Sequence, residues 1–187
     1  MKKILLGGLI TLLLLVSINS YSQFLRDDNL VFELGHEQID IGQSYIKTDS
    51  LLRKMRFRLD SVGVIQIKER IFKFKLYTGD LNGEKANIMI VLSKYDLVWK
   101  LVVDVFSKDP IYSYDLYKYT LSKEYGKSNI INDCISSGKI WSLWQSKDRL
   151  VNGDSVNAIS LCLEETSSES AVISIVYQHS VYLSIDE

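Results

Sequence analysis

Histidine is scarce in this chain, and the common catalytic motifs are missing. Its 187 residues contain only two histidines, His36 and His179. They contain no Walker phosphate loop, no dinucleotide-binding glycine pattern, no Cys-x-x-Cys pair and no His-x-x-x-His pair. These are the short motifs by which P-loop, Rossmann and zinc chemistry are usually recognised. We therefore expect no cofactor and no metal site.

Two stretches begin like catalytic motifs but do not complete them. The sequence "HEQID" (36–40) starts like a zinc-protease motif, but Asp40 stands in place of the second histidine. Ser155 follows Gly-Asp, as in a family of serine esterases, but it comes after a predicted turn and leads into a strand. A serine nucleophile also needs a histidine base held by a third group, which the sequence does not show. We favour a protein that is not an enzyme. The alternative is a hydrolase built from scattered residues such as His36, Asp40 and Ser155.

Proline and cysteine are also rare. Pro110 is the only proline, and it lies at the junction of two similar stretches of sequence. The two cysteines, Cys134 and Cys162, could form a disulfide in an oxidising compartment. Nothing in the sequence brings their Cα atoms within the roughly 4.4–6.8 Å that a disulfide requires. We favour two separate thiols, and whether they are bridged stays open.

A basic and apolar leader opens the chain. Two lysines precede an apolar run over residues 4–16, which is shorter than the about 20 residues of a transmembrane helix. Ser20 and Ser22 supply the small residues of a signal-peptide cleavage site. We predict that residues 1–22 are a cleaved signal peptide and that the protein is periplasmic or extracellular. The membrane is then touched only through that cleaved segment. An uncleaved N-terminal anchor is the alternative.

Neither sign of charge dominates the composition. The formal net charge is −1, and it becomes −3 once the two leader lysines are removed. This balance, with a sequence pI of about 6.2, argues against nucleic-acid binding. Removal of 22 residues from 187 leaves 165, a length that buries about 70% of its unfolded surface. One hydrophobic core can therefore form without support from a metal or a disulfide.

Two helices are predicted by apolar residues at helical spacing, and each precedes a run of strands. The first helix covers residues 48–62, and its apolar stripe comprises Leu51, Leu52, Met55, Leu59 and Val62. The second covers residues 112–125, and its apolar stripe comprises Tyr114, Tyr117, Leu121 and Tyr125. Consecutive strands with short turns pair antiparallel. The first helix is expected to begin at Thr48 or Asp49 and to end at Gly63, and the second to begin at Ser113 and to end at Gly126. The expected strands cover residues 71–78, 86–93, 97–107, 139–145, 155–165 and 170–179. Two further short strands are possible at residues 36–41 and 64–68.

One stretch of sequence recurs, in altered form, in the second half of the chain. The stretch "LNGEKANIMIVL" returns seventy residues later as "VNGDSVNAISLC". In both copies Asn-Gly, a strong hairpin signal, precedes an apolar strand. A calcium loop starting at Asp80 would need a carboxylate at position 12, where Val91 stands. We therefore predict hairpin turns at Asn82-Gly83 and Asn152-Gly153, with Val103 and Ile173 in matching places.

The fold class expected from this pattern is α+β. We predict two αβββ units that form one extended antiparallel sheet with both helices on one face. The first unit covers residues 48–107 and the second covers residues 108–187. Residues 23–47 form an N-terminal segment between the signal peptide and the first unit.

Several stretches carry a family resemblance, namely "FKFKLYTGDLNGEKANIMIVL", "VWKLVVDVF" and "YDLYKYTLSKEYGKS". Two units of a helix followed by an antiparallel meander resemble the tandem repeat of the β-lactamase-inhibitor-protein-like fold. The stretches are also similar to uncharacterised small secreted bacterial domains. The resemblance covers most of the mature chain and implies a fold and a secreted setting. It carries over no functional residue, since a fold does not determine a function.

Exposed aromatic and basic residues supply the candidate binding surface. Tyrosines crowd the second predicted helix, and some must face outward, where they can anchor a sugar or a protein. Residues 47–75 hold nine basic residues against three acids, which could meet an anionic envelope polymer or an acidic partner. A core packing layer and an ordinary solvated surface are the alternatives. The candidates are Tyr112, Tyr119, Arg53, Arg56, Lys73 and Lys75.

The function expected from these observations is non-catalytic binding by an exported protein. The partner would be an unidentified protein or an envelope polysaccharide. A structural partner of a larger envelope assembly is a second alternative beside the hydrolase, and it would show a contiguous exposed apolar patch.

Export gives the first testable prediction. Mass spectrometry of the protein purified from the native envelope should find an N-terminus at Gln23, because the small residues end at Ser22. Mature protein that starts at Met1 would contradict this prediction.

Overall fold

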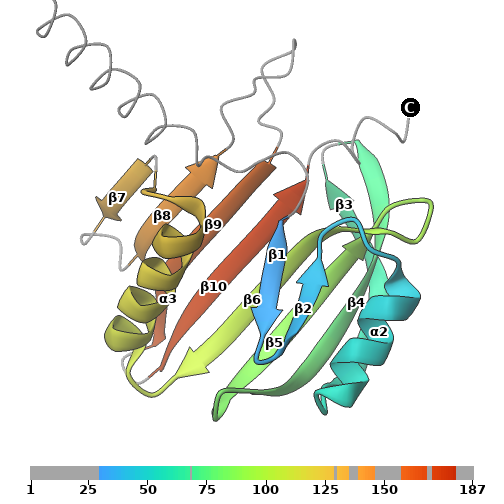
Figure 1. Cartoon of the computed structure of the whole chain (residues 1–187), viewed down its shortest axis with the longest axis horizontal. Helices are drawn as coiled ribbons and strands as arrows, with labels where there is room; N and C mark the ends of the chain where they lie inside the picture. Colours follow the sequence, from blue (N-terminus) through green and yellow to red (C-terminus); the bar gives the residue numbers. More distant parts are fainter. Residues whose placement is uncertain are drawn as a thin grey trace, which may run out of the picture.

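The computed structural model describes residues 30–67, 69–128, 130–134, 139–145, 157–167 and 170–179. Two helices and ten strands are described within them (Figure 1). The elements are β1 (Val31–Leu34), β2 (Glu37–Asp40), α2 (Tyr45–Lys54), β3 (Arg58–Ile67), β4 (Arg70–Leu81), β5 (Glu84–Leu92), β6 (Val98–Ser107), α3 (Pro110–Tyr125), β7 (Ile130–Cys134), β8 (Lys139–Gln145), β9 (Asn157–Ser167) and β10 (Ser170–His179).

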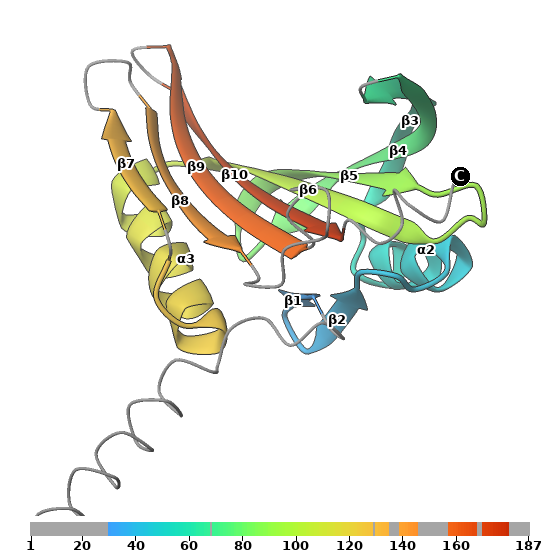
Figure 2. The ribbon, with the colours of Figure 1, turned by 90° about the horizontal axis from the view of Figure 1, so that it is seen from above.

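Eight of the strands form one antiparallel sheet in the order β3-β4-β5-β6-β10-β9-β8-β7. The short strands β1 and β2 pair with each other in a separate hairpin. Both helices and this hairpin lie on the same side of the large sheet (Figure 2). The predicted α+β class and the predicted antiparallel sheet are therefore confirmed. The predicted signal peptide, the Asn152-Gly153 turn and Ser155 lie outside the described residues.

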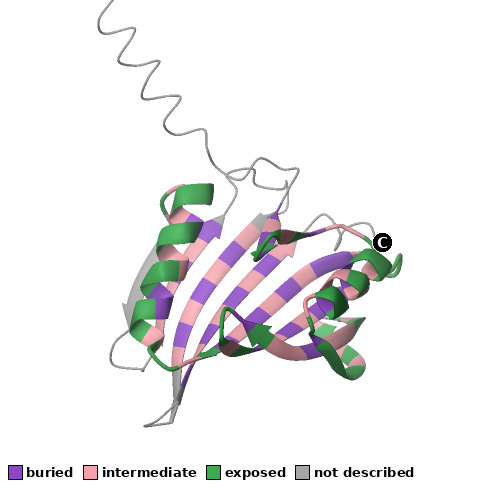
Figure 3. Cartoon of the chain, turned by 60° about the horizontal axis from the view of Figure 1, so that its bottom comes forward, coloured by how far each residue is buried: buried purple, intermediate pink, exposed green. Residues whose placement is uncertain are grey.

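The hydrophobic core lies between the large sheet and the elements on its helical side. Buried and half-buried residues alternate along the strands (Figure 3), because successive strand side chains point to opposite faces. Burial of one such aliphatic side chain stabilises the fold by about 1.5–3 kcal/mol. One buried row crosses six adjacent strands through Tyr77, Ile88, Val103, Ile175, Leu161 and Ser142.

Each end of this row is tied to one helix by a tyrosine hydroxyl. The Tyr77 hydroxyl on β4 donates to the carboxylate of Asp49 on α2 at 2.6 Å. The Tyr114 hydroxyl on α3 shares a buried hydrogen bond of 3.0 Å with Ser142 on β8. A buried hydroxyl must find such a partner, because an unpaired one costs about 1–3 kcal/mol. The tyrosines therefore fix where each helix sits on the sheet.

The predicted hairpin at Asn82-Gly83 is confirmed. Leu81 pairs with Glu84, so the turn has two residues. Both have positive φ, 55° at Asn82 and 87° at Gly83, as a type I′ turn requires. The backbone N–H of Gly83 also donates to the side chain of Asp80 at 2.7 Å. This short turn fixes the register of β4 and β5.

The first predicted helix is wrong over its second half. The helix α2 ends at Lys54 instead of residue 62, and β3 begins at Arg58. Leu59 and Val62, expected on its apolar stripe, are exposed strand residues. Gly63 lies within β3 under the ring of Phe74, which a Cβ atom would approach to 2.8 Å. The β-branched run that follows favours a strand, so four strands follow this helix where three were predicted.

The end of α2 explains why the helix stops early. Its cap Met55 is followed by Arg56, whose φ is 65°. The N–H of Arg56 donates to the carbonyl of Arg53 at 2.9 Å, and the N–H of Phe57 donates to the carbonyl of Leu52 at 2.9 Å. These two bonds define a Schellman motif, in which glycine usually occupies the left-handed position. Here arginine occupies it.

The second helix agrees with the prediction except at its N-cap. Asp109 caps α3 by accepting from the N–H of Tyr112 at 3.2 Å, and Pro110 opens the first turn. Ser113, the predicted cap, is instead buried and shares a hydrogen bond of 2.8 Å with Ser107. Gly126 ends the helix as predicted, and the buried residues on its inner face include Tyr114, Leu121 and Tyr125.

Arg56→Gly should stabilise the protein, because a left-handed conformation costs an L-residue about 1 kcal/mol and costs glycine almost nothing. We expect the melting temperature to rise by about 2–4 °C. The matched control, Ser50→Gly, introduces glycine at an exposed position inside α2 and should lower it. A lower melting temperature for Arg56→Gly than for the wild type would contradict the prediction.

Candidate functional site

One face of the large sheet has no described helix or strand packed on it. We call this side, opposite the helices, the uncovered face. In Figure 2 both ends of the sheet bend toward it, so it is concave. Two rows of half-buried side chains cross its middle in register. The first row is apolar except for one serine and comprises Leu76, Met89, Val102, Val176, Ser160 and Leu143. The second row is more polar and comprises Thr78, Asn87, Asp104, Ser174, Cys162 and Trp141.

A small aromatic cluster occupies one part of the uncovered face. Phe72, Val91 and Trp99 are buried together there, with Phe72 and Trp99 ring centroids 4.9 Å apart. Trp99 sits at the irregularity where β5 and β6 lose their regular register. Its buried indole N–H has no acceptor within the described part of the chain. Lys100 follows it on the same face, and burial lowers the pKa of its ammonium.

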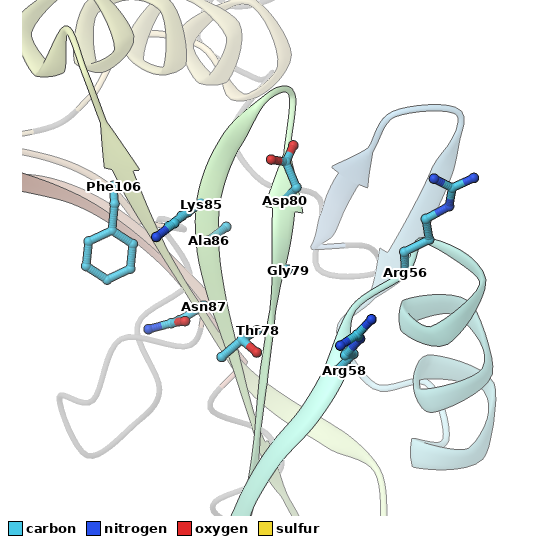
Figure 4. A pocket seen from close by; sticks show the side chains of 9 residues that line it. All are labelled: Arg56, Arg58, Thr78, Gly79, Asp80, Lys85, Ala86, Asn87 and Phe106. Atoms are coloured by element: carbon cyan, nitrogen blue, oxygen red, sulfur yellow. The ribbon is translucent and has the colours of Figure 1, made fainter.

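A groove of about 650 Å³ lies at another part of the uncovered face. It starts at the loop after α2 and crosses β3, β4, β5 and β6 (Figure 4). Arg56 and Arg58 lie at one end, while Lys85 lies toward Phe106 at the other. We call it the basic groove. Its lining consists of Arg56, Arg58, Thr78, Gly79, Asp80, Lys85, Ala86, Asn87 and Phe106.

Positive charge exceeds negative charge in the lining of the basic groove, with three cations against the single carboxylate of Asp80. Among the described residues, none of Arg56, Arg58 and Lys85 forms an ion pair. Asp80, the one acid that lines the groove, accepts the N–H of Gly83 in the hairpin turn. Asp104, opposite Asn87, accepts the hydroxyl of Ser174 at 2.5 Å. An incoming anion would therefore meet three exposed cations.

The structure does not gather the six predicted binding residues on one surface. Only Arg56 lines the basic groove. The Arg53 guanidinium is engaged by Asp49 at 2.8 Å, and the Lys75 ammonium lies 3.6 Å from the centroid of the Tyr45 ring. Lys73 is exposed on β4. Tyr112 and Tyr119 are exposed on α3, toward the other end of the sheet from α2 (Figure 1).

Strand register brings together the groove residues that were not predicted from the sequence. Thr78 pairs with Asn87 and Asp80 with Lys85, at fixed distances from the Asn82-Gly83 turn. Counting outward from a two-residue turn would have placed all four correctly. Nothing local marks Phe106, which reaches the groove only because β6 pairs with β5.

The residues considered for a hydrolase do not converge in the described part of the chain. His36 lies exposed in the turn between β1 and β2. Asp40 is engaged by Lys47 at 3.4 Å. No group of three or more His, Cys, Asp and Glu that could hold a metal occurs among the described residues. Cys162 is half-buried on the uncovered face, whereas the side chain of Cys134 lies outside what is described.

Comparison with known proteins adds no family. No family model matches the chain, and no curated protein and no solved structure matches it either. The resemblance to the β-lactamase-inhibitor-protein-like fold therefore stays a prediction. Among the described helices, none is both long and apolar enough to span a membrane.

Asp49 shows why Arg53 is better placed for stability than for binding. Its carboxylate accepts from Arg53 at 2.8 Å and from the Tyr77 hydroxyl at 2.6 Å. Burial acts to raise the pKa of Asp49, but the bonds from Arg53 and Tyr77 outweigh it and hold the pKa below its ordinary value. The charged form is therefore favoured by folding. Its stabilisation is present above the pKa of the unfolded chain and is lost as the pH falls through the folded value.

Asp49→Asn should therefore lower the stability by about 1 kcal/mol at pH 7. The deficit should shrink toward pH 3, where the wild-type carboxylate also becomes protonated. Thermal unfolding of both proteins between pH 3 and pH 8 measures the difference. A deficit that stays constant over this range would show that the charge of Asp49 plays no part.

Proposed function

We propose that this chain is an exported, non-catalytic binding protein that holds its ligand against the uncovered face. The observation that carries the proposal is this face itself. It combines a concave shape, a row of half-buried apolar side chains and a groove with unbalanced positive charge. Residues that only complete a core are normally covered by a second layer. A layer of this kind covers only the opposite face among the described elements.

Two further readings stand beside it. The apolar row with Leu76, Met89 and Val102 favours a structural partner of an envelope assembly as the second candidate, because proteins commonly join through such surfaces. A hydrolase is the third. It would need groups that converge outside the described residues.

We also propose that the chain contains two copies of one unit. Each half of the described chain runs as a helix followed by four strands, and the sheet order β3-β4-β5-β6 is mirrored by β10-β9-β8-β7. Val103 and Ile173, seventy residues apart, are both fully buried on the helical side. These features support the tandem repeat and the likeness to the β-lactamase-inhibitor-protein-like fold.

Site-specific photo-crosslinking in the producing cell tests the proposed function. A photoreactive amino acid at Val102, Val176 or Asn87 should form adducts with the ligand, since these positions lie on the uncovered face. The same amino acid at exposed Asp115 on α3 serves as the control. Tyr119 probes the predicted tyrosine surface. Equal adducts at Asp115, or adducts only at Tyr119, would overturn the proposal for this face.

A further inference from the structure

We propose that the basic groove binds an anionic oligosaccharide, a sugar chain that carries carboxylate or phosphate groups. The inference rests on the proposed function and names the ligand class for one part of the same face. It is supported by the arrangement of the cations, the backbone conformation of Arg56 and the neutral residues between the cations.

The cations are spread along the groove. Arg56 and Arg58 lie at one end, and Lys85 lies at the other, beside Phe106 (Figure 4). Guanidinium groups match carboxylates and phosphates through paired hydrogen bonds, and an ammonium binds them as a point charge. Because the positive groups are separated, an extended ligand with repeated anionic groups fits them better than a single small anion.

Arg56 has a backbone conformation that is unfavourable for any residue except glycine. Its φ of 65° lies in the left-handed region, at the position of a Schellman motif that glycine usually fills. Non-glycine residues held in this conformation cluster at functional sites, where the surrounding structure compensates for the backbone cost. The helix end needs no side chain at this position. Arg56 does line one end of the groove, so a ligand bound there explains why arginine stands at this position.

Neutral groups fill the space between the cations. Thr78 and Asn87 are cross-strand partners on the floor of the groove and offer a hydroxyl and an amide. The ring of Phe106 is 40% exposed beside them. Sugar hydroxyls can bond with such polar groups, while the apolar face of a pyranose ring can pack on an aromatic ring. The groove offers about 650 Å³ of space and is open to solvent, so a sugar chain would lie along it without being enclosed.

Isothermal titration calorimetry of the mature protein tests the ligand class with four probes. A uronic-acid tetramer and a phosphorylated mannose oligomer distinguish carboxylate from phosphate. A neutral maltotetraose and a tetraglutamate peptide separate charge from the sugar. We expect binding of at least one anionic sugar, a weaker affinity at higher salt, and no measurable binding of maltotetraose. Failure of both anionic sugars, or a preference for tetraglutamate, would overturn the inference.

Variants locate the binding in the groove. Arg56→Gly should weaken the binding of the anionic sugar by about tenfold without lowering the melting temperature, so the loss cannot come from unfolding. Arg58→Ala with Lys85→Ala should weaken it further. The matched control removes three exposed lysines outside the groove, through Lys108→Ala, Lys123→Ala and Lys127→Ala. The net charge of this control then equals that of a variant that lacks all three groove cations.

The outcomes separate the two proposals. Equal losses in the groove variants and in the control would show a general charge effect and overturn the groove as the site. Crosslinks at Val102 and Val176 together with no sugar binding would leave the uncovered face as the binding surface and reject only the ligand class. Sugar binding that survives all groove substitutions would place the sugar elsewhere on the protein.

Discussion

The pairing of β6 with β10 is the contact on which the rest of the molecule depends. Eight residue pairs join these strands, and they are the only ladder between the two halves of the described sheet. The pairing brings Val103 opposite Ile175 in the middle of the core. It also supports the N-terminal hairpin, because Phe32 of β1 packs against Tyr177 of β10 with centroids 5.6 Å apart. Without this ladder, each helix would cover a four-stranded sheet with an open central edge.

Because strand side chains alternate, one face of the sheet packs the core and the other carries polar and charged groups. The same strands that give Ile88 and Val103 to the core give Asn87 and Asp104 to the opposite side. The helical side can therefore be packed for stability, while the uncovered face carries polar and charged groups at little cost to the core. Asp49 and Tyr77 belong to the first task. The basic groove belongs to the second.

The sequence predicted the features that depend on local pattern. Asn82-Gly83 predicted its hairpin, and the tyrosines of residues 112–125 predicted the inner face of α3. The same logic failed at residues 55–62, because their apolar spacing also fits a helix and only the turn at Arg56 separates it from β3. Of the groove residues, only Arg56 was among the binding residues predicted from the sequence. Its other members come from three strands and meet only through long-range pairing, which no single stretch of sequence records.

The two-residue turn between β4 and β5 has a consequence for how such a groove can change over time. Substitutions at Asn82 or Gly83 would alter the turn, yet leave Thr78 opposite Asn87. An inserted residue that the turn does not absorb would shift the pairing by one position and send Lys85 and Asn87 to the helical side, since neighbouring side chains point in opposite directions. A related chain could thus keep every groove residue and still lose the groove. The length of this loop, more than the identity of the cations, would show whether the site has been inherited.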